Sequence, residues 1–334
     1  MVLRIGVIGA GAISQVAHLP VLSKFKGVEV VAVCDNDSGK ARALASRFAV
    51  RDAFDDIEDL LTYARPDAVV ICTPNHLHDV HVVTALTAGV HVLCERPLSL
   101  TPEGVERIIA ARERTGRVVM VGMNYRFRSD VQAVRGFLRG GELGELKAVR
   151  AGWYIFRPAR VLPEWRRRGA QAGGGAMFDL GLPMLDLAWW LAGYPRPRHV
   201  AAALEKPDSP GGVEESGCAL IVCDGGTSIF VDVSWRHVGD SERIWLDLQG
   251  DRGSASIAPL KVSKEMHGTP VNVTPTGAAE RENPFTASYR SEWAYFLAVI
   301  RGEVPPPELA DQLQVQRLLA AIYRSAEEGR DVTL

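Results

Sequence analysis

The first third of the chain alternates short apolar runs, rich in β-branched residues, with segments of helical periodicity. The runs are LRIGVIG, VEVVAVCD, DAVVICTP, HVLCERP and RVVMVGM, at residues 3–9, 28–35, 67–74, 91–97 and 117–123. Continuous apolar runs suit strands that are buried on both faces, and the helical segments supply the crossovers that parallel strands need. The alternation therefore predicts a doubly wound parallel sheet built from βαβ units and ending near residue 123.

The sequence GVIGAGAIS follows the first run and places Gly9, Gly11 and Ser14 in the frame G-x-G-x-x-small. The first glycine permits a tight turn, the second lets a pyrophosphate approach the backbone, and the helix that follows offers free N–H groups to that anion. Asp35 ends the second run, where a carboxylate accepts hydrogen bonds from the adenine ribose and repels a 2′-phosphate. We therefore expect NAD rather than NADP, held by Gly9, Gly11, Ala12, Ile13 and Asp35. The alternative, that Asp35 merely caps the next helix, stays open.

After residue 124 the pattern changes to longer alternating strands. They are expected around 145–154, 197–205, 214–223, 227–235 and 241–249, with helices near 128–139, 176–191, 286–300 and 308–328. Strands gathered together predict an α+β domain with a large open, mostly antiparallel sheet. A chain of 334 residues is longer than one hydrophobic core usually supports. We therefore divide it into a Rossmann domain, residues 1–123, and a substrate-binding and oligomerisation domain, residues 124–334.

One of these strands, 227–235, carries an apolar face made of Ile229, Val231, Val233 and Trp235. If this face is the outer face of the sheet, it predicts contact with a second copy of the chain. If it is the inner face, it covers the helices of its own domain. The sequence leaves both interpretations open.

Composition excludes several classes of protein. The net charge is −2 and no stretch of about eighteen apolar residues occurs, so neither a nucleic-acid surface nor a membrane span is expected. The N-terminus lacks the pattern of a signal peptide. The cysteines are odd in number and lie apart in apolar runs, which is typical of reduced thiols in a cytoplasmic protein.

Further motifs resemble one family. TPNHLH (73–78), CERP (94–97), GMNYRF (122–127) and GGGAMFDLG (173–181), together with GVIGAGAIS, are similar to the glucose–fructose oxidoreductase, inositol dehydrogenase and rhizopine-catabolism (Gfo/Idh/MocA) family. The resemblance implies a Rossmann domain followed by an open-faced α/β domain, whose sheets often pair in dimers or tetramers. It also implies oxidation or reduction of a secondary alcohol or carbonyl on sugars, cyclitols and related compounds.

The resemblance implies positions for the cofactor. Thr73, Pro74, Asn75 and His78 are expected near the nicotinamide, and Glu95 and Arg96 beside the nicotinamide ribose. This placement agrees with the rule that ligands lie at the carboxyl ends of parallel strands. No metal is expected, since no nearby carboxylate or cysteine completes a ligand set around His76, His78 and His81.

Two positions depart from the family pattern. Arg96 stands where the family has a lysine, and Pro183 stands where it has the histidine of Asp-x-x-x-His. Arginine polarises an oxygen but cannot serve as a base near neutral pH. Asp179 then becomes the expected general base. Proline lacks an N–H for the Asp179 carbonyl, so we expect the helix to begin or kink near 182–183, after a separate turn at 176–181.

The loop at residues 153–175 supplies further candidates. Tyr154 offers a phenol for proton transfer, Trp165 a ring for stacking on a sugar, and Arg157 or Arg160 a guanidinium for an anion. Arg126, from the GMNYRF motif, is expected to contact substrate. For each loop residue a structural role is an equal alternative, and Arg166 to Arg168 are expected to be solvated. The five arginines of the loop favour an anionic substrate such as a sugar acid.

Three functions follow from these observations. The first is an NAD-dependent dehydrogenase or reductase of a sugar, cyclitol or sugar acid, with Asp179 as base and Arg96 as the polarising group. The second is an enzyme that retains NAD and uses it transiently for elimination or glycoside cleavage. The third is a dinucleotide- or sugar-binding protein without catalytic activity.

Overall fold

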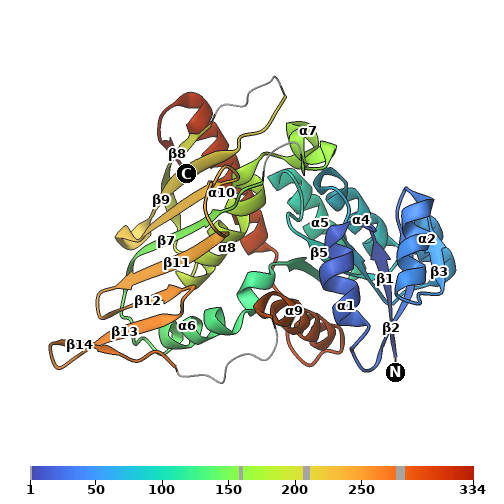
Figure 1. Ribbon diagram of the computed structural model, residues 1–334, viewed down its shortest axis with the longest axis horizontal. Coiled ribbons are helices and arrows are strands. Elements are labelled where there is room, and N and C mark those ends of the chain that lie inside the picture. Colours follow the sequence, from blue (N-terminus) through green and yellow to red (C-terminus); the bar gives the residue numbers. More distant parts are fainter. Residues whose placement is uncertain (1, 158–160, 206–210, 276–282) are drawn as a thin grey trace. The chain divides into compact units, whose positions relative to one another are not determined.

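The computed structural model describes residues 2–157, 161–205, 211–275 and 283–334 (Figure 1). The chain forms two compact units. One unit is Met1–Phe127 with Arg281–Leu313, and the other is Arg128–Glu280 with Gln314–Leu334. The two units therefore divide the chain at three places, after residues 127, 280 and 313, whereas the sequence predicted one boundary near residue 123. Residues 281–313 return to the N-terminal unit, although their sequence position assigned them to the second domain.

The N-terminal unit contains a six-stranded, fully parallel sheet in the order β3-β2-β1-β4-β5-β6. Its strands are β1 (Leu3–Ile8), β2 (Val28–Cys34), β3 (Asp52–Phe54), β4 (Ala68–Ile71), β5 (His91–Glu95) and β6 (Val119–Gly122). This is the strand order of the dinucleotide-binding Rossmann fold. The predicted doubly wound sheet is confirmed. The additional strand is β3, which is too short to produce an apolar run in the sequence.

Helices connect these strands. The first crossover is a π turn, η1 (Ser14–His18), that continues into α1 (Leu19–Leu22). The other crossovers contain α2 (Ser38–Arg47), α3 (Ile57–Asp59) with the π turn η2 (Leu60–Ala64), α4 (His78–Thr87) and α5 (Pro102–Thr115). The helix α9 (Pro284–Ile300) comes from late in the chain and belongs to the same unit. The helix α5 shows the expected local signals, since Thr101 caps its first turn and Gly116 ends it with a left-handed backbone.

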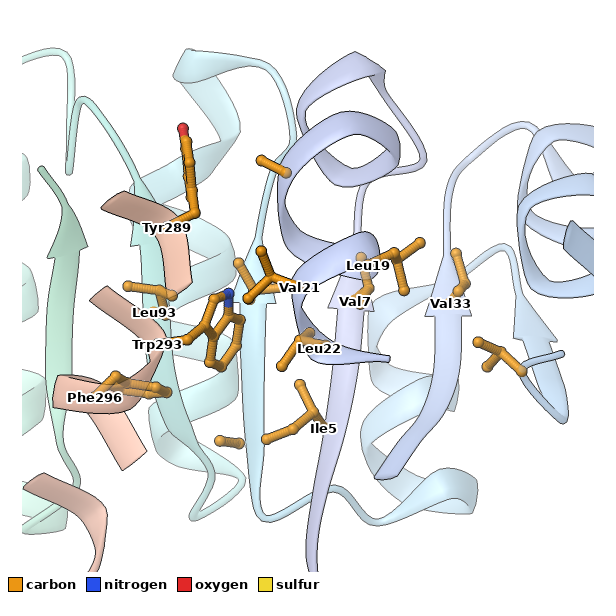
Figure 2. Close-up of a cluster of buried hydrophobic side chains, with 14 of the residues drawn as sticks. Ile5, Val7, Leu19, Val21, Leu22, Val33, Leu93, Tyr289, Trp293 and Phe296 are labelled. Atoms are coloured by element: carbon orange, nitrogen blue, oxygen red, sulfur yellow. The ribbon is translucent and has the colours of Figure 1, made fainter. Parts of the chain in front are cut away.

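The apolar core of this unit explains why α9 belongs to it. Tyr289, Trp293 and Phe296 of α9 join the same buried cluster as the strand residues Ile5 and Leu93 (Figure 2). Trp293 and Phe296 are fully buried. Burial of an aromatic side chain stabilises a fold by roughly 1.5–3 kcal/mol. Docking on this core, rather than position in the sequence, therefore decides which unit holds α9.

The second unit contains a nine-stranded sheet in the order β14-β13-β12-β11-β7-β10-β9-β8-β15. Its strands are β7 (Leu146–Tyr154), β8 (Pro197–Leu204), β9 (Ser216–Cys223), β10 (Ser228–Ser234), β11 (Arg243–Gly250), β12 (Gly253–Ile257), β13 (Lys261–Met266), β14 (Thr269–Asn272) and β15 (Val332–Thr333). The pair β7 and β10 is parallel and the other pairs are antiparallel. The predicted open, mostly antiparallel sheet is confirmed.

Helices cover one face of this sheet. They are α6 (Ser129–Arg139), α8 (Leu182–Leu191) and the part of α10 (Ala310–Glu328) that follows Leu313, whereas the short helix α7 (Gly169–Ala172) packs beside the turn Glu164–Arg167. The side chains of Ile229, Val231, Val233 and Trp235 are at most 1% exposed, and β10 contacts α8. Of the two interpretations left open for this apolar face, the second is therefore correct, because the face covers helices of its own unit.

Two simple expectations can be compared with the structure. All five cysteines are free thiols, and Cys34, Cys94 and Cys223 are buried. In the part of the chain that the structure describes, every helix is too short or too polar to cross a bilayer.

Candidate active site

The glycine loop has the geometry that a dinucleotide requires. Gly9 has φ +101°, and a Cβ at that position would lie 2.6 Å from the carbonyl oxygen of Cys72. A larger residue at position 9 is therefore excluded for two reasons, the positive φ and the collision with the Cys72 carbonyl oxygen. Gly11 differs, since a Cβ there would meet no atom within 4 Å. The second glycine thus faces open space, into which a pyrophosphate can approach the backbone.

The third small residue of the motif, Ser14, packs against the glycine loop and hydrogen-bonds its backbone. Ser14 is fully buried, and its hydroxyl donates to the carbonyl oxygen of Gly9 at 2.5 Å. A serine therefore satisfies the packing requirement of this position and adds a hydrogen bond that glycine or alanine cannot make.

Asp35 lies directly against the glycine loop. Its Oδ2 accepts the Ala10 N–H at 2.8 Å, and its Oδ1 accepts the Asp37 N–H at 3.0 Å. The helix α2 is capped instead by Asp37, which accepts the N–H groups of Gly39 and Lys40. The alternative in which Asp35 caps that helix is therefore wrong. Its carboxylate is half-buried beside the loop, where the ribose position is expected.

Replacing Asp35 with serine tests this position. We expect NADH affinity to fall roughly tenfold and NADPH affinity to rise, because the charge that repels a 2′-phosphate is removed. Fluorescence titration of both dinucleotides measures the two constants. The matched control is Asp52→Ser, a partly buried carboxylate on the neighbouring strand β3. An unchanged ratio of the two affinities in Asp35→Ser would contradict the assignment.

The parallel register gathers the other cofactor candidates at the same edge of the sheet. Ile8 of β1 pairs with Ile71 of β4, and Ile71 pairs with Cys94 of β5. The segments that follow these strands therefore end together, in agreement with the rule for ligand sites in such sheets. They contain the candidates Thr73, Pro74, Asn75, Glu95 and Arg96, of which all but Glu95 are partly exposed.

His78 holds two of these segments together. It is 1% exposed, and its ring nitrogens lie 2.6 Å from the Pro97 carbonyl oxygen and 2.8 Å from that of Thr73. Burial lowers the pKa of this histidine. A side chain with so little accessible surface supports the turns rather than contacting a cofactor. Thr73 itself hydrogen-bonds His81 at 3.0 Å.

Glu95 is the centre of a buried polar network that the sequence did not indicate. The Trp293 indole N–H donates to His18 Nδ1 at 3.0 Å, which leaves the other ring N–H of His18 to donate to Glu95 Oε1 at 2.9 Å. The Tyr289 hydroxyl also donates to Glu95 Oε1, at 3.2 Å. Tyr289, a direct partner of Glu95, and Trp293, the partner of His18, both come from α9, so the position of the Glu95–Arg96 segment depends on that helix.

Glu292 lies on the same helix and has a different environment. It is fully buried, and among the described residues neither of its carboxyl oxygens has a hydrogen-bond partner. Burial raises its pKa well above the ordinary value, and the charge of nearby Glu95 acts in the same direction. Both effects favour the protonated, neutral form of this side chain.

Arg126, expected to contact substrate, is engaged within the N-terminal unit. Both of its terminal nitrogens donate to Asp311 Oδ2 at 3.0 Å, and both side chains are largely buried. The pair ties the segment after β6 to residues late in the chain, so the structure gives Arg126 a supporting role.

In the second unit, Asp179 lies on a π turn. The helix starts with this turn, η7 (Met177–Gly181), and continues as α8 with Pro183 in its first turn. The Leu182 N–H bonds the Met177 carbonyl five residues earlier, so the wider turn ends just before the proline that lacks an N–H. The same arrangement precedes Pro20 in η1 and α1. The expected change of backbone at 182–183 is confirmed.

Arginine and tryptophan side chains among the described residues donate to the Asp179 carboxylate. Arg157 donates to Oδ2 at 2.5 Å, Arg166 donates to Oδ1 at 2.6 Å, and the Trp235 indole N–H donates to Oδ2 at 3.2 Å. The Asp179 side chain is 12% exposed, against 29% for Arg157 and 32% for Arg166. Charge-assisted hydrogen bonds of this kind are about twice as strong as neutral ones. We call Arg157, Asp179 and Arg166 the arginine–aspartate triad.

The last two of the three glycines before this helix are explained by the packing around another buried carboxylate. Glu214 accepts the N–H groups of Gly175 at 2.9 Å and Met177 at 3.0 Å, and the Tyr323 hydroxyl at 2.7 Å. A Cβ on Gly174 would collide with the Tyr323 hydroxyl, and one on Gly175 with the Glu214 backbone. Burial raises the pKa of Glu214. Glu214 therefore fixes the first turn of the helix that carries Asp179.

Tyr154 is not brought to Asp179. It pairs with Ser234 across β7 and β10, so its side chain lies on the sheet face opposite to that of Trp235. The Tyr154 hydroxyl donates to Asp232 at 2.5 Å, and burial, with this hydrogen bond, raises the pKa of Tyr154 to about 12. The hypothesis that Tyr154 transfers a proton together with Asp179 finds no support in this placement.

The remaining loop candidates differ from one another. Trp165 is half-buried, with the Arg166 guanidinium 4.7 Å from the centre of its ring. The expectation that Arg166 is merely solvated is wrong, since it binds Asp179. Arg167 and Arg168 are exposed, and Arg168 pairs with Glu164. Arg160 lies outside the described residues.

Comparisons with known proteins identify the family. Residues 3–123 match the model of an oxidoreductase family with an NAD-binding Rossmann fold, and residues 131–256 match the Gfo/Idh/MocA C-terminal domain. An uncharacterized oxidoreductase, ORF334 of Rhizobium meliloti, is 32% identical, covering 98% of this chain and 97% of its own. The chain belongs to the Gfo/Idh/MocA family.

Other members of the Gfo/Idh/MocA family have named activities. D-glucoside 3-dehydrogenase of Escherichia coli is 28% identical, covering 99% of this chain and 97% of its own. The structure of GenD2 from gentamicin A biosynthesis, in complex with NAD, is 26% identical, with a TM-score of 0.85 and coverage of 99% and 96%. This Gfo/Idh/MocA chain is an oxidoreductase with NAD as cofactor.

Proposed function

We propose that the protein is an NAD-dependent oxidoreductase that acts on a secondary hydroxyl or carbonyl of a sugar, cyclitol or sugar acid, with Arg96 and Pro183 altering the family's site. One observation carries the proposal. The glycine loop leaves open space at Gly11, with the Asp35 carboxylate directly beside it. A chain without a use for NAD has no need of that geometry. The names of related sugar dehydrogenases support the substrate class.

The residues of the N-terminal unit fit NAD. Gly9, Gly11, Ala12 and Ile13 would hold the pyrophosphate, Asp35 the adenine ribose, and Thr73, Pro74 and Asn75 the nicotinamide end. NAD, when bound, accepts or supplies the hydride. The buried His18 and Tyr289 hold Glu95. They thereby fix the backbone next to Arg96, whose permanently charged guanidinium polarises the reacting oxygen.

Asp179 is proposed as the group that takes the hydroxyl proton. Its oxygens already accept hydrogen bonds from two arginines and a tryptophan. A substrate hydroxyl therefore has to replace one of these donors before it can give its proton to the carboxylate. The supporting observation is the anchoring of Asp179 by Trp235 and by the turn that Glu214 caps, which limits movement of the carboxylate during that exchange.

The test begins with the purified protein. Absorbance and mass spectrometry show whether a dinucleotide copurifies, and fluorescence titration gives the affinities for NADH and NADPH. Sugars, cyclitols and sugar acids are then screened with NAD for NADH formation. We expect NADH binding and turnover of at least one polyol. Bound NAD without net NADH formation would favour a lyase or glycosidase, and binding without any chemistry would favour a sensor.

We also propose a cytoplasmic homodimer or homotetramer that pairs through the outer face of the nine-stranded sheet. Leu220 and Val222 on this face are 40% and 36% exposed, with Phe230 half-buried beside Leu220. Free thiols at all five cysteines suit a reducing compartment. Sedimentation measurements on the protein and on Leu220→Lys test the assembly.

A further inference from the structure

The arginine–aspartate triad carries more positive charge than its carboxylate offsets. Two guanidinium groups share one carboxylate, so the triad holds a net charge of +1, that is 2 − 1. Trp235, which also donates to Asp179, is uncharged. A half-buried site with an uncompensated positive charge attracts an anion and is unfavourable for a cation.

Each guanidinium also retains donors. A guanidinium has five N–H donors, whereas Arg157 and Arg166 each place one nitrogen on Asp179. Within the described ranges, neither side chain has a further hydrogen bond to an acceptor. Both remain about a third exposed, so these donors reach solvent.

The two arginines are also held in place. Asp179 binds both of them, and the Trp165 ring lies 4.7 Å from the Arg166 guanidinium carbon. The Arg157 backbone N–H donates to the Trp235 carbonyl at 2.8 Å, which fixes the chain where Arg157 leaves the sheet. Donors that are positioned before a ligand arrives lose little entropy when it binds.

We infer that the arginine–aspartate triad is the specificity site for a carboxylate group of the substrate, so that the protein acts on a sugar acid rather than a neutral sugar. This inference rests on the proposed function. A planar carboxylate matches the fork of a guanidinium, and a monoanion matches a net charge of +1 better than a phosphate dianion does. When the substrate carboxylate takes over donors of Arg157 and Arg166, an Asp179 oxygen becomes available for the reacting hydroxyl.

The experiment compares matched pairs of compounds in the presence of NAD. D-gluconate is set against D-glucose, D-galactonate against D-galactose and D-glucuronate against D-glucose, and both NADH formation and calorimetric binding are measured. We expect at least one acid to exceed its neutral partner roughly tenfold or more in kcat/KM and in affinity, the effect of one or more charge-assisted hydrogen bonds. D-glucose 6-phosphate tests the alternative anion.

Three variants assign the effect to the triad. Arg157→Gln and Arg166→Gln should each lower affinity for the acid roughly tenfold to a hundredfold, and the ratio of acid affinity to neutral-sugar affinity should fall by the same factor. Arg166→Lys should recover part of the loss. Arg167→Gln is the control, since that neighbouring arginine is exposed and makes no contact with Asp179.

The outcomes separate this inference from the proposed function. Turnover of neutral sugars that equals or exceeds that of every acid would overturn the inference and leave the oxidoreductase function standing. Binding of an acid that Arg166→Gln abolishes, without NADH formation, would support the inference and contradict the proposed function. Failure of every acid to bind better than its neutral partner, or preference for the phosphate, also overturns the inference.

Discussion

Asp179→Asn is expected to lower kcat by a factor on the order of 10² to 10⁴, which is the usual range for loss of an acid–base group. Asparagine offers one acceptor oxygen where Arg157 and Arg166 each require one, so the variant also leaves a guanidinium without its partner. Because the nucleotide loop lies in the other unit, NADH affinity should be unchanged. Steady-state kinetics on the best substrate of the screen and NADH titration measure the two effects.

Two comparisons make the Asp179→Asn result specific. Asp247→Asn changes an exposed carboxylate on β11 and should retain full activity. Thermal unfolding of both variants shows whether loss of activity comes from loss of folded protein. An Asp179→Asn enzyme with a kcat close to that of the unmodified protein would remove Asp179 from the proton transfer.

The second large effect is expected for Glu292→Gln, as a change in how stability depends on pH. Burial raises the pKa of Glu292 well above its ordinary value in the folded protein. A group with a raised folded pKa stabilises the fold below its unfolded pKa, and this contribution is lost as the pH rises toward the folded pKa. The loss is about 1.4 kcal/mol for each pH unit within that window. Glutamine cannot ionise, so the variant should not show this loss.

Urea unfolding between pH 5 and pH 8 measures the difference. We expect the free energy of unfolding of the unmodified protein to fall relative to that of Glu292→Gln as the pH rises across this range, because only the unmodified protein has a buried carboxyl that ionises on unfolding. Glu29→Gln, an exposed glutamate on β2, is the control and should follow the unmodified protein. If the unfolding free energies of Glu292→Gln and of the unmodified protein depended on pH in the same way, the pKa of Glu292 would not differ between the folded and unfolded protein, and the prediction would be wrong.

Sequence patterns predicted the strands that are long and either continuously apolar or strictly alternating. They did not predict β12, β13 and β14, which are short and carry serine, lysine and threonine on exposed faces. Such strands form because β11 offers an edge for pairing. The presence of that edge depends on the tertiary structure, so a local sequence pattern does not predict it. The assignment of α9 was wrong for a related reason, because the partner of its apolar face lies nearly three hundred residues earlier.

The nucleotide site could be predicted because its residues act through backbone geometry at fixed spacing. Gly9, Gly11 and Asp35 are of this kind. The triad was only partly predicted. Arg157 and Asp179 were candidates, but nothing in the sequence distinguished Arg166 from Arg167, since only the fold selects which neighbour points toward Asp179. Glu214 carried one weak signal, Gly174 and Gly175, where a Cβ would collide with Tyr323 and with the Glu214 backbone.

The place of α9 in the N-terminal core has a consequence for synthesis of the chain. The strands β1 to β6 leave the ribosome before α9, yet Trp293 and Phe296 of α9 complete their core only after residue 300 has been made. Until then the growing chain exposes apolar surface that α9 later covers, which is a state prone to aggregation. Native folding of the nucleotide-binding unit is therefore delayed until α9 has been made.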